Sequence, residues 1–284
     1  MTTKTHIDRR TNLRGSIWMV AAMAIFAIED AFVKAASSTL SVGLVLIIFG
    51  LGGAAVFASL ARFNGEPLFV QDVVSRPMRI RVVFEIVGRL FYVLAITLTP
   101  LSAATVILQA TPLVVVVGAA LVFGEKVGWR RWFAIFVGLT GVVIIIQPGT
   151  DSFSVLSILA IVGMFGFAGR DLAIRAAPAT LSTNILGFYG FLSIVVAGGV
   201  FSVWEEAALV SPDIETSLYL LGAILAGVGA YSCLMKAMRT GEVSAVTPFR
   251  YTRLLFGIAL GVVDLYHLLC TGDWTGLFWR SSSR

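Results

Sequence analysis

The sequence has few charged residues: Asp, Glu, Lys and Arg make up 13% of its 284 residues, against about 25% in soluble domains. Apolar residues make up 58%, and the mean hydropathy is +0.92. A surface helix of a soluble protein has a polar face toward water, and most of this sequence lacks the polar residues for such a face. The composition therefore excludes an ordinary soluble fold and indicates that lipid is the main solvent of the chain.

Histidine and cysteine are scarce, with two residues of each. Cys233 and Cys270 lie in apolar segments, and His6 and His267 are far apart in the chain, which excludes a disulfide framework and a CxxC metal site. HExxH, GxSxG and Walker motifs are also missing. We therefore expect no metal, no cofactor, no catalytic residues and no direct use of ATP, and a membrane-embedded enzyme is the less favoured alternative.

Apolar runs of helical length follow one another along the whole chain. At roughly 20 residues a span, with short turns, about ten spans fill the sequence, whereas barrel strands would be alternating runs of about ten residues. The runs cover Gly15–Ala36, Leu40–Leu60, Ile80–Leu98, Ser102–Phe123, Trp132–Ile146, Ser154–Ile174, Leu181–Trp204, Leu218–Met238, Val243–Val263 and, more weakly, Leu265–Trp279. The last run is short for a span and contains Asp273, so it is the least secure helix.

Positive charge alternates between successive loops, which predicts the orientation in the membrane. Lys and Arg gather before the first span and in every second loop, namely at Lys4, Arg9, Arg10, Arg14, Arg62, Arg76, Arg79, Arg81, Lys126, Arg130, Arg131, Arg175, Lys236, Arg239, Arg280 and Arg284. We therefore expect residues 1–14 to form a cytoplasmic tail, both termini to lie inside, and the protein to cross a bacterial inner membrane many times. Because the basic residues lie in short loops, the net charge of +5 does not indicate nucleic-acid binding.

The two halves of the sequence resemble each other. At an offset of 141 residues, the segment Phe26–Ala36 aligns with Phe167–Ala177 with five of eleven positions identical, and at 142 residues Ser102–Thr105 aligns with Ser244–Thr247. Chance similarity between alanine-rich spans is the alternative. A repeat of five spans places the second unit upside down in the membrane, an arrangement typical of secondary transporters. We expect residues 15–146 and 147–284 to be the two units of an all-α membrane protein.

These features resemble the drug/metabolite transporter superfamily in its ten-helix, EamA-type branch. The resemblance rests on Ser102–Thr105, Pro112, the segment Phe123–Glu125, Trp129 or Trp132, the segment Gly138–Gly149 and the second-half segment Gly241–Phe249. It implies two inverted five-helix repeats that move a small metabolite through a central cavity by alternating access, most often as an exporter of amino acids, including aromatic ones. An importer of another metabolite is the alternative. One departure is that His267 stands where the repeat would match Glu125.

Ionisable residues inside the spans are the candidates for function, because a charge at bilayer depth costs at least about 2.5–3.5 kcal/mol and normally faces the interior of the bundle. For a zwitterionic substrate we expect an arginine to bind the carboxylate, a carboxylate to bind the ammonium and aromatic residues to hold an apolar side chain. The substrate candidates are Phe26, Asp30, Glu85, Arg89, Tyr92, Tyr231, Phe249, Arg250, Tyr251 and Arg253. The alternative for each is a structural ion pair, a lipid-facing position or a core position.

Other residues are candidates for movement of the helices. The pairs Asp30/Lys34, Glu85/Arg89 and Asp171/Arg175 are spaced to interact within one helix, and Glu29 aligns with Arg170, which suggests an ion pair that gates the cavity. The gate candidates are Glu29, Lys34, Arg170, Asp171 and Arg175, and the hinge candidates are Pro112 and Pro248, with static kinks as the alternative. The expected partners are a small-molecule substrate, the bilayer and a coupling proton, in a monomer or alternatively a dimer.

Overall fold

The computed structural model describes residues 9–98, 107–146, 156–205 and 211–260. These residues form nine α-helices, two 3-10 helices and no strand. The helices are α1 (Arg9–Ala36), α2 (Val42–Phe63), α3 (Arg76–Leu98), α5 (Thr111–Phe123), α6 (Trp129–Ile146), α7 (Ser157–Ala176), α8 (Thr183–Glu205), α9 (Ile214–Thr240) and α10 (Val243–Val246), with 3-10 helices η1 (Gln71–Val74) and η3 (Thr247–Tyr251). Residues 252–260 continue as α-helix.

Local sequence signals fix several helix ends. Ser41 and Asp213 begin α2 and α9, where their side chains accept hydrogen bonds from the N–H groups of Leu44 and Thr216, which otherwise have no partner in the helix. Gly124 ends α5 at a φ of 64°, a left-handed conformation that favours glycine. The apolar runs are therefore bounded by residues that stop and start helices.

Five helices are long and apolar enough to cross a membrane, namely α1, α2, α7, α8 and α9. The all-helical, multi-pass architecture expected from the sequence is thus confirmed for the described residues. Most helices begin a few residues earlier or end later than expected; α3, for example, begins at Arg76 and not at Ile80. The expected tenth span at 265–279 and the Ser102–Thr105 segment lie outside the described residues.

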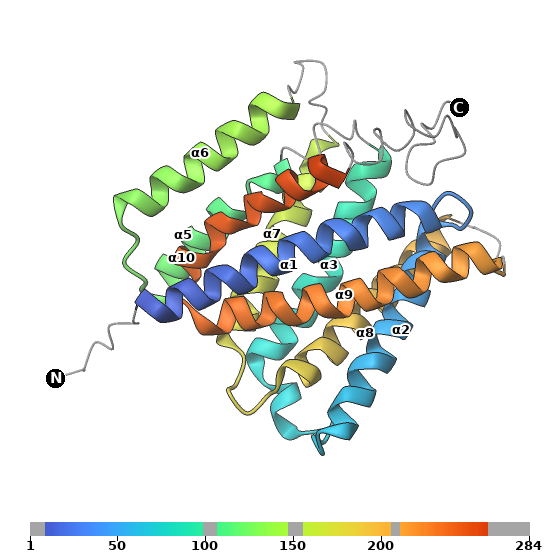
Figure 1. Ribbon diagram of the computed structural model, residues 1–284. Helices are drawn as coiled ribbons and strands as arrows, with labels where there is room; N and C mark the ends of the chain where they lie inside the picture. Colours follow the sequence, from blue (N-terminus) through green and yellow to red (C-terminus); the bar gives the residue numbers. More distant parts are fainter. Residues whose placement is uncertain (1–8, 99–106, 147–155, 206–210, 261–284) are drawn as a thin grey trace.

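Three antiparallel helix pairs organise the bundle: α1 packs along α9, α2 along α8 and α3 along α7 (Figure 1). The α3–α7 pair approaches closely where glycines of the two helices face each other. A Cβ atom on Gly166 would lie 2.4 Å from the Cα of Gly88, so Gly166 does not accommodate a side chain without moving a helix.

The ninth expected span is interrupted. It begins as α10, tightens into η3 from Thr247 to Tyr251 around Pro248, and resumes as α-helix over residues 252–260. On the other half of the molecule α5 begins at Thr111 with Pro112 in its first turn, after a turn at Ala110. The two hinge candidates therefore both lie where a helix changes character, because proline has no N–H to donate and clashes with the preceding turn.

Candidate functional site

A chain of buried charges connects four elements in the middle of the bundle. Glu85 on α3 accepts hydrogen bonds from Tyr231 on α9 and, at 3.2 Å, from Arg170 on α7. Arg170 also lies 2.9 Å from Asp171, and Asp171 in turn lies within ion-pair distance of Arg250 on η3. Glu85 and Asp171 are 1% and 0% exposed. The contacts compensate much of the cost of burying these charges, because each carboxylate has at least one cation beside it.

Arg81 extends this chain toward the start of α3 and was missed as a site residue by the sequence. It is 1% exposed, and its Nη2 donates to the Leu186 carbonyl at 2.7 Å and to the Tyr231 hydroxyl at 3.2 Å. The expected span began at Ile80, so Arg81 was its second residue and was counted only with the positive charges that set the orientation. Its spacing of four residues from Glu85 is the signal that places it on the same inward face.

A second ion pair joins the two ends of the described sequence. The Arg253 guanidinium donates from Nε to Asp30 Oδ2 at 2.9 Å and from Nη2 to Asp30 Oδ1 at 2.6 Å. The same guanidinium lies 5.1 Å from the centre of the Phe26 ring. Phe26, Asp30 and Arg253, three substrate candidates from α1 and residues 252–260, are therefore in one group.

Glu29 and Arg89 lie close to these ion pairs, but each retains an unpartnered atom. Glu29 is 6% exposed, and its Oε2 has no hydrogen-bond partner among the described residues; the same is true of the buried Nε of Arg89. Neither residue is in an ion pair among the described residues. A buried acceptor on α1 and a buried donor on α3 thus remain unsatisfied, which is costly unless something binds them.

Aromatic rings lie beside these two groups. The Arg89 Cζ lies 6.0 Å from the centre of the Phe167 ring, and the Tyr92 and Phe167 rings meet edge to face with their centres 5.8 Å apart. Arg170 approaches the same Phe167 ring at 5.0 Å. Phe167 was not among the expected site residues; its place in the internal repeat opposite Phe26 is the signal that would have found it.

The structure replaces several expected pairs with others. Glu85 binds Arg170 and not Arg89, and Asp171 binds Arg170 and Arg250 and not Arg175. Arg170 consequently does not bind Glu29. Sequence spacing places a residue on a helix face, whereas the partner depends on the helix that packs against this face.

Some candidates lie away from the cluster. Arg175 donates to the carbonyls of Met238 and Arg239. Phe249 is 40% exposed, and Tyr251 packs against α6, where its ring would be 2.3 Å from a Cβ on Gly138. These three residues therefore do not join the buried group. Lys34 lies in the last turn of α1.

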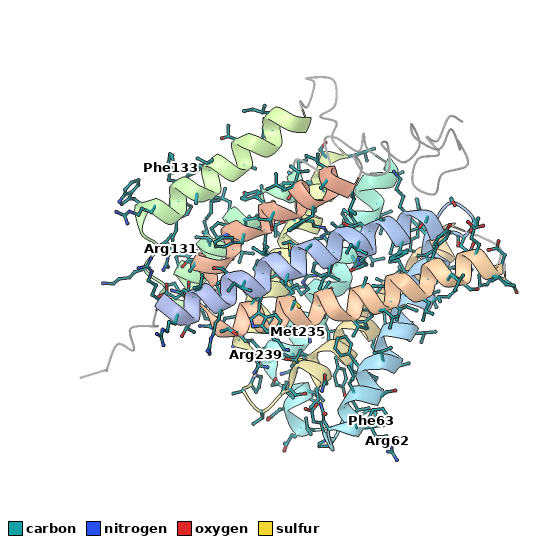
Figure 2. The ribbon with its side chains drawn as sticks, viewed as in Figure 1. Arg62, Phe63, Arg131, Phe133, Met235 and Arg239 are labelled. Carbon is teal, nitrogen blue, oxygen red and sulfur yellow. The ribbon has the colours of Figure 1, made fainter. Side chains whose placement is uncertain are left out.

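Polar contacts connect the helices at the end of the bundle where α1, α3 and α6 begin, which we call the basic end because Arg62, Arg76, Arg79, Lys126 and Arg130 lie there. Glu125 accepts hydrogen bonds from the N–H groups of Val243 and Ser244, each at 3.0 Å. Arg131 on α6 donates to Ser244 at 2.6 Å, and Arg239 on α9 donates to the Leu181 carbonyl at 2.6 Å (Figure 2). The bonds of Glu125 and Arg131 tie the first half of the chain to the second, whereas Arg239 and Leu181 both belong to the second half.

Comparisons with known proteins agree with these features. Residues 13–147 match the EamA-like transporter family. The chain is 25% identical to a riboflavin transporter of Vibrio cholerae, with 88% of this chain and 84% of the relative covered. It is 27% identical to the pseudopaline exporter CntI of Pseudomonas aeruginosa (87% and 86% covered) and 24% identical to an S-adenosylmethionine uptake transporter of Rickettsia prowazekii (87% and 82% covered).

The fold also matches a solved structure. A crystal structure superposes with a TM-score of 0.74 at 18% sequence identity, covering 90% of this chain and 88% of the other. This likeness concerns the fold alone. The relatives differ in what their names say they carry, so the substrate of this chain has to be argued from its own residues.

Proposed function

We propose, from the premise that the chain belongs to the EamA-like transporter family, that it carries a small zwitterionic metabolite, and first of all an amino acid, across the membrane. It is a multi-pass membrane protein of a transporter family and not an enzyme. One observation carries the proposal for the substrate: Glu29 Oε2 and Arg89 Nε are both buried and have no partner among the described residues.

The chemistry of these two groups fits the two ends of an amino acid. A guanidinium binds a carboxylate through charge-assisted hydrogen bonds, so Arg89 takes the carboxylate of the substrate. The Glu29 carboxylate accepts hydrogen bonds from the ammonium group. Phe26, Tyr92 and Phe167 provide apolar surface for the side chain, which favours aromatic and apolar amino acids.

The pairing of the helices supports two inverted repeats of five helices. If α1, α2 and α3 correspond to α7, α8 and α9, exchanging the two units converts the α1–α9 pair into the α7–α3 pair and leaves the α2–α8 pair unchanged. All three pairs are present in the bundle. Such repeats place the substrate at their interface and alternate its access between the two sides, and the buried cluster lies between α1, α3 and α7.

We propose that both termini lie in the cytoplasm of a bacterium and that the basic end faces it, following the charge rule for membrane loops. We also propose export as the direction of transport. The sequence resemblance to amino-acid exporters supports export, as does a relative named as an exporter, whereas another relative is named for uptake. Import of another small metabolite is therefore the second candidate.

A proton is proposed to occupy Glu29 when no substrate is bound. A carboxylate at bilayer depth is expensive without a partner, and Asp30 beside it adds a second negative charge that already binds Arg253. The ammonium group of the substrate would displace this proton when it binds. Transport of the substrate in one direction would then be coupled to movement of a proton in the other.

Counterflow in reconstituted vesicles tests the proposal. We expect vesicles loaded with an unlabelled aromatic amino acid to accumulate the labelled one, and Glu29→Gln and Arg89→Gln to lower the rate at least about tenfold through the loss of a charged hydrogen bond. Glu215→Gln and Arg10→Gln are the matched controls, since both residues are exposed, and should transport normally. Accumulation of riboflavin and of no amino acid would favour the second candidate.

A further inference from the structure

The outer face of α3 carries a hollow that is separate from the buried cluster. The hollow has a volume of about 310 Å³ and is lined by Arg76, Arg79, Ile80, Val83 and Phe84. Arg76, Arg79, Ile80 and Val83 are exposed, Val83 to 59%. The inward face of the same helix carries Arg81 and Glu85, so α3 presents two sets of charges to two different environments.

The two arginines of the hollow have no ion pair or hydrogen bond from their side chains within the described part of the chain. Arg81, one turn further along, differs in binding a carbonyl and a hydroxyl group. Two neighbouring guanidinium groups that lack an anion repel each other, and an anion between them would remove this repulsion.

The order of residues along the helix distinguishes one anion from others. Arg76 and Arg79 lie in the first turn of α3, and Val83 lies about 10 Å further along the helix axis at 1.5 Å per residue. The lining thus changes from two positive charges to apolar side chains over the distance that separates the headgroup region from the hydrocarbon. A soluble anion would contact only the two arginines. A phospholipid would contact the arginines through its headgroup and the apolar side chains through an acyl chain.

We propose that this hollow binds an anionic phospholipid, with its headgroup phosphate between Arg76 and Arg79 and an acyl chain along Ile80, Val83 and Phe84. Basic pockets beside membrane helices bind anionic headgroups by this combination of charge and apolar surface. The site lies at the basic end, so its ligand belongs to the leaflet that this end faces. It does not depend on the transported substrate.

Native mass spectrometry of the detergent-purified protein tests the site, with phosphatidylglycerol and phosphatidylethanolamine as probes. We expect phosphatidylglycerol to bind the wild type, and Arg76→Gln/Arg79→Gln to weaken it about 10- to 30-fold, since each arginine near a membrane surface contributes about 1 kcal/mol. Arg10→Gln/Arg14→Gln is the matched control, because it removes two exposed arginines one turn apart at the start of α1.

A second variant, Val83→Ser, tests the apolar part and leaves both charges in place. It should weaken phosphatidylglycerol several-fold and leave the binding of glycerol phosphate, a headgroup without chains, unchanged. Equal weakening by the control pair, equal binding of phosphatidylethanolamine, or equal binding of glycerol phosphate and the lipid would each overturn the proposal. The first would indicate general attraction by positive charge, the second a lack of headgroup selectivity and the third a site for a free phosphate group.

Discussion

Asp30 and Asp171 occupy matching positions in the two halves of the chain, yet their surroundings differ. The Asp30 side chain is 53% exposed and binds Arg253, whereas the Asp171 side chain is 0% exposed and lies between Arg170 and Arg250. The aspartate at this position of the proposed repeat is therefore half exposed in the first half of the chain and fully buried in the second.

The arginines explain much of this difference. Arg250 and Arg253 both come from the interrupted helix of the second half, and at the 142-residue offset of this segment the first half has Leu108 and Thr111. One helix thus supplies cations to both aspartates. In the proposed repeat the two halves therefore differ in charge, and the second half supplies the arginines of both ion pairs.

Replacing the sealed aspartate should have the largest effect. Asp171→Asn leaves Arg170 and Arg250 facing an amide in a buried site, and the loss of one partner of a buried pair costs about 3–5 kcal/mol. Asp30→Asn should cost about 1 kcal/mol or less, since its pair is half exposed. Thermal unfolding of both variants in detergent measures this difference. A comparable loss in Asp30→Asn would mean that the two sites are energetically alike.

Exchanging the charges sharpens the contrast. In Asp30→Arg/Arg253→Asp the ion pair is reversed in a half-exposed place, so the double variant should recover most of the stability that either single change removes. In Asp171→Arg/Arg250→Asp the new arginine faces Arg170, and no recovery is expected. A double-mutant cycle on unfolding free energies measures both couplings. If Asp171→Arg/Arg250→Asp recovered the stability lost in the single variants, Arg170 would not be an essential partner of Asp171.

The two buried glutamates allow a comparison of intermediate size. Glu85 has two partners, so Glu85→Gln should destabilise the protein by about 1.5–3 kcal/mol through weaker bonds to Arg170 and Tyr231. Glu29 has an oxygen with no partner among the described residues, so Glu29→Gln should leave stability nearly unchanged while transport is lost. Unfolding and counterflow measured on the same preparations separate the two roles. Loss of stability in Glu29→Gln would assign it a structural role.

Much of the fold was predictable from the sequence, and the contacts of the site were less so. Apolar run length predicted the helices. The cost of buried charge correctly predicted that Glu85 and Asp171 would lie inside the bundle, whereas the Asp30 side chain is 53% exposed. The partners were not predictable, because Glu85 meets Arg170 only through the packing of α3 on α7. Arg81 stood at the start of the expected span, where a positive charge is read as a signal of orientation, and its burial follows from the packing of α3 on α8 and α9.

A third aspartate extends the comparison to the surface, where the smallest effect is expected. Exposed Asp213 caps α9, and hydrogen bonds from the Thr216 side chain and its N–H hold the pKa of Asp213 below its ordinary value. A lowered pKa in the folded state means that the cap stabilises the protein at neutral pH and that this contribution is lost as the pH falls through the lowered pKa.

Asp213→Ser keeps an oxygen that accepts the hydrogen bond but does not titrate, so it should remove this part of the acid sensitivity in thermal unfolding. Asp213→Ala, in contrast, should lower stability at neutral pH. If Asp213→Ser unfolds with the acid sensitivity of the wild type, the Asp213 cap is not responsible for it.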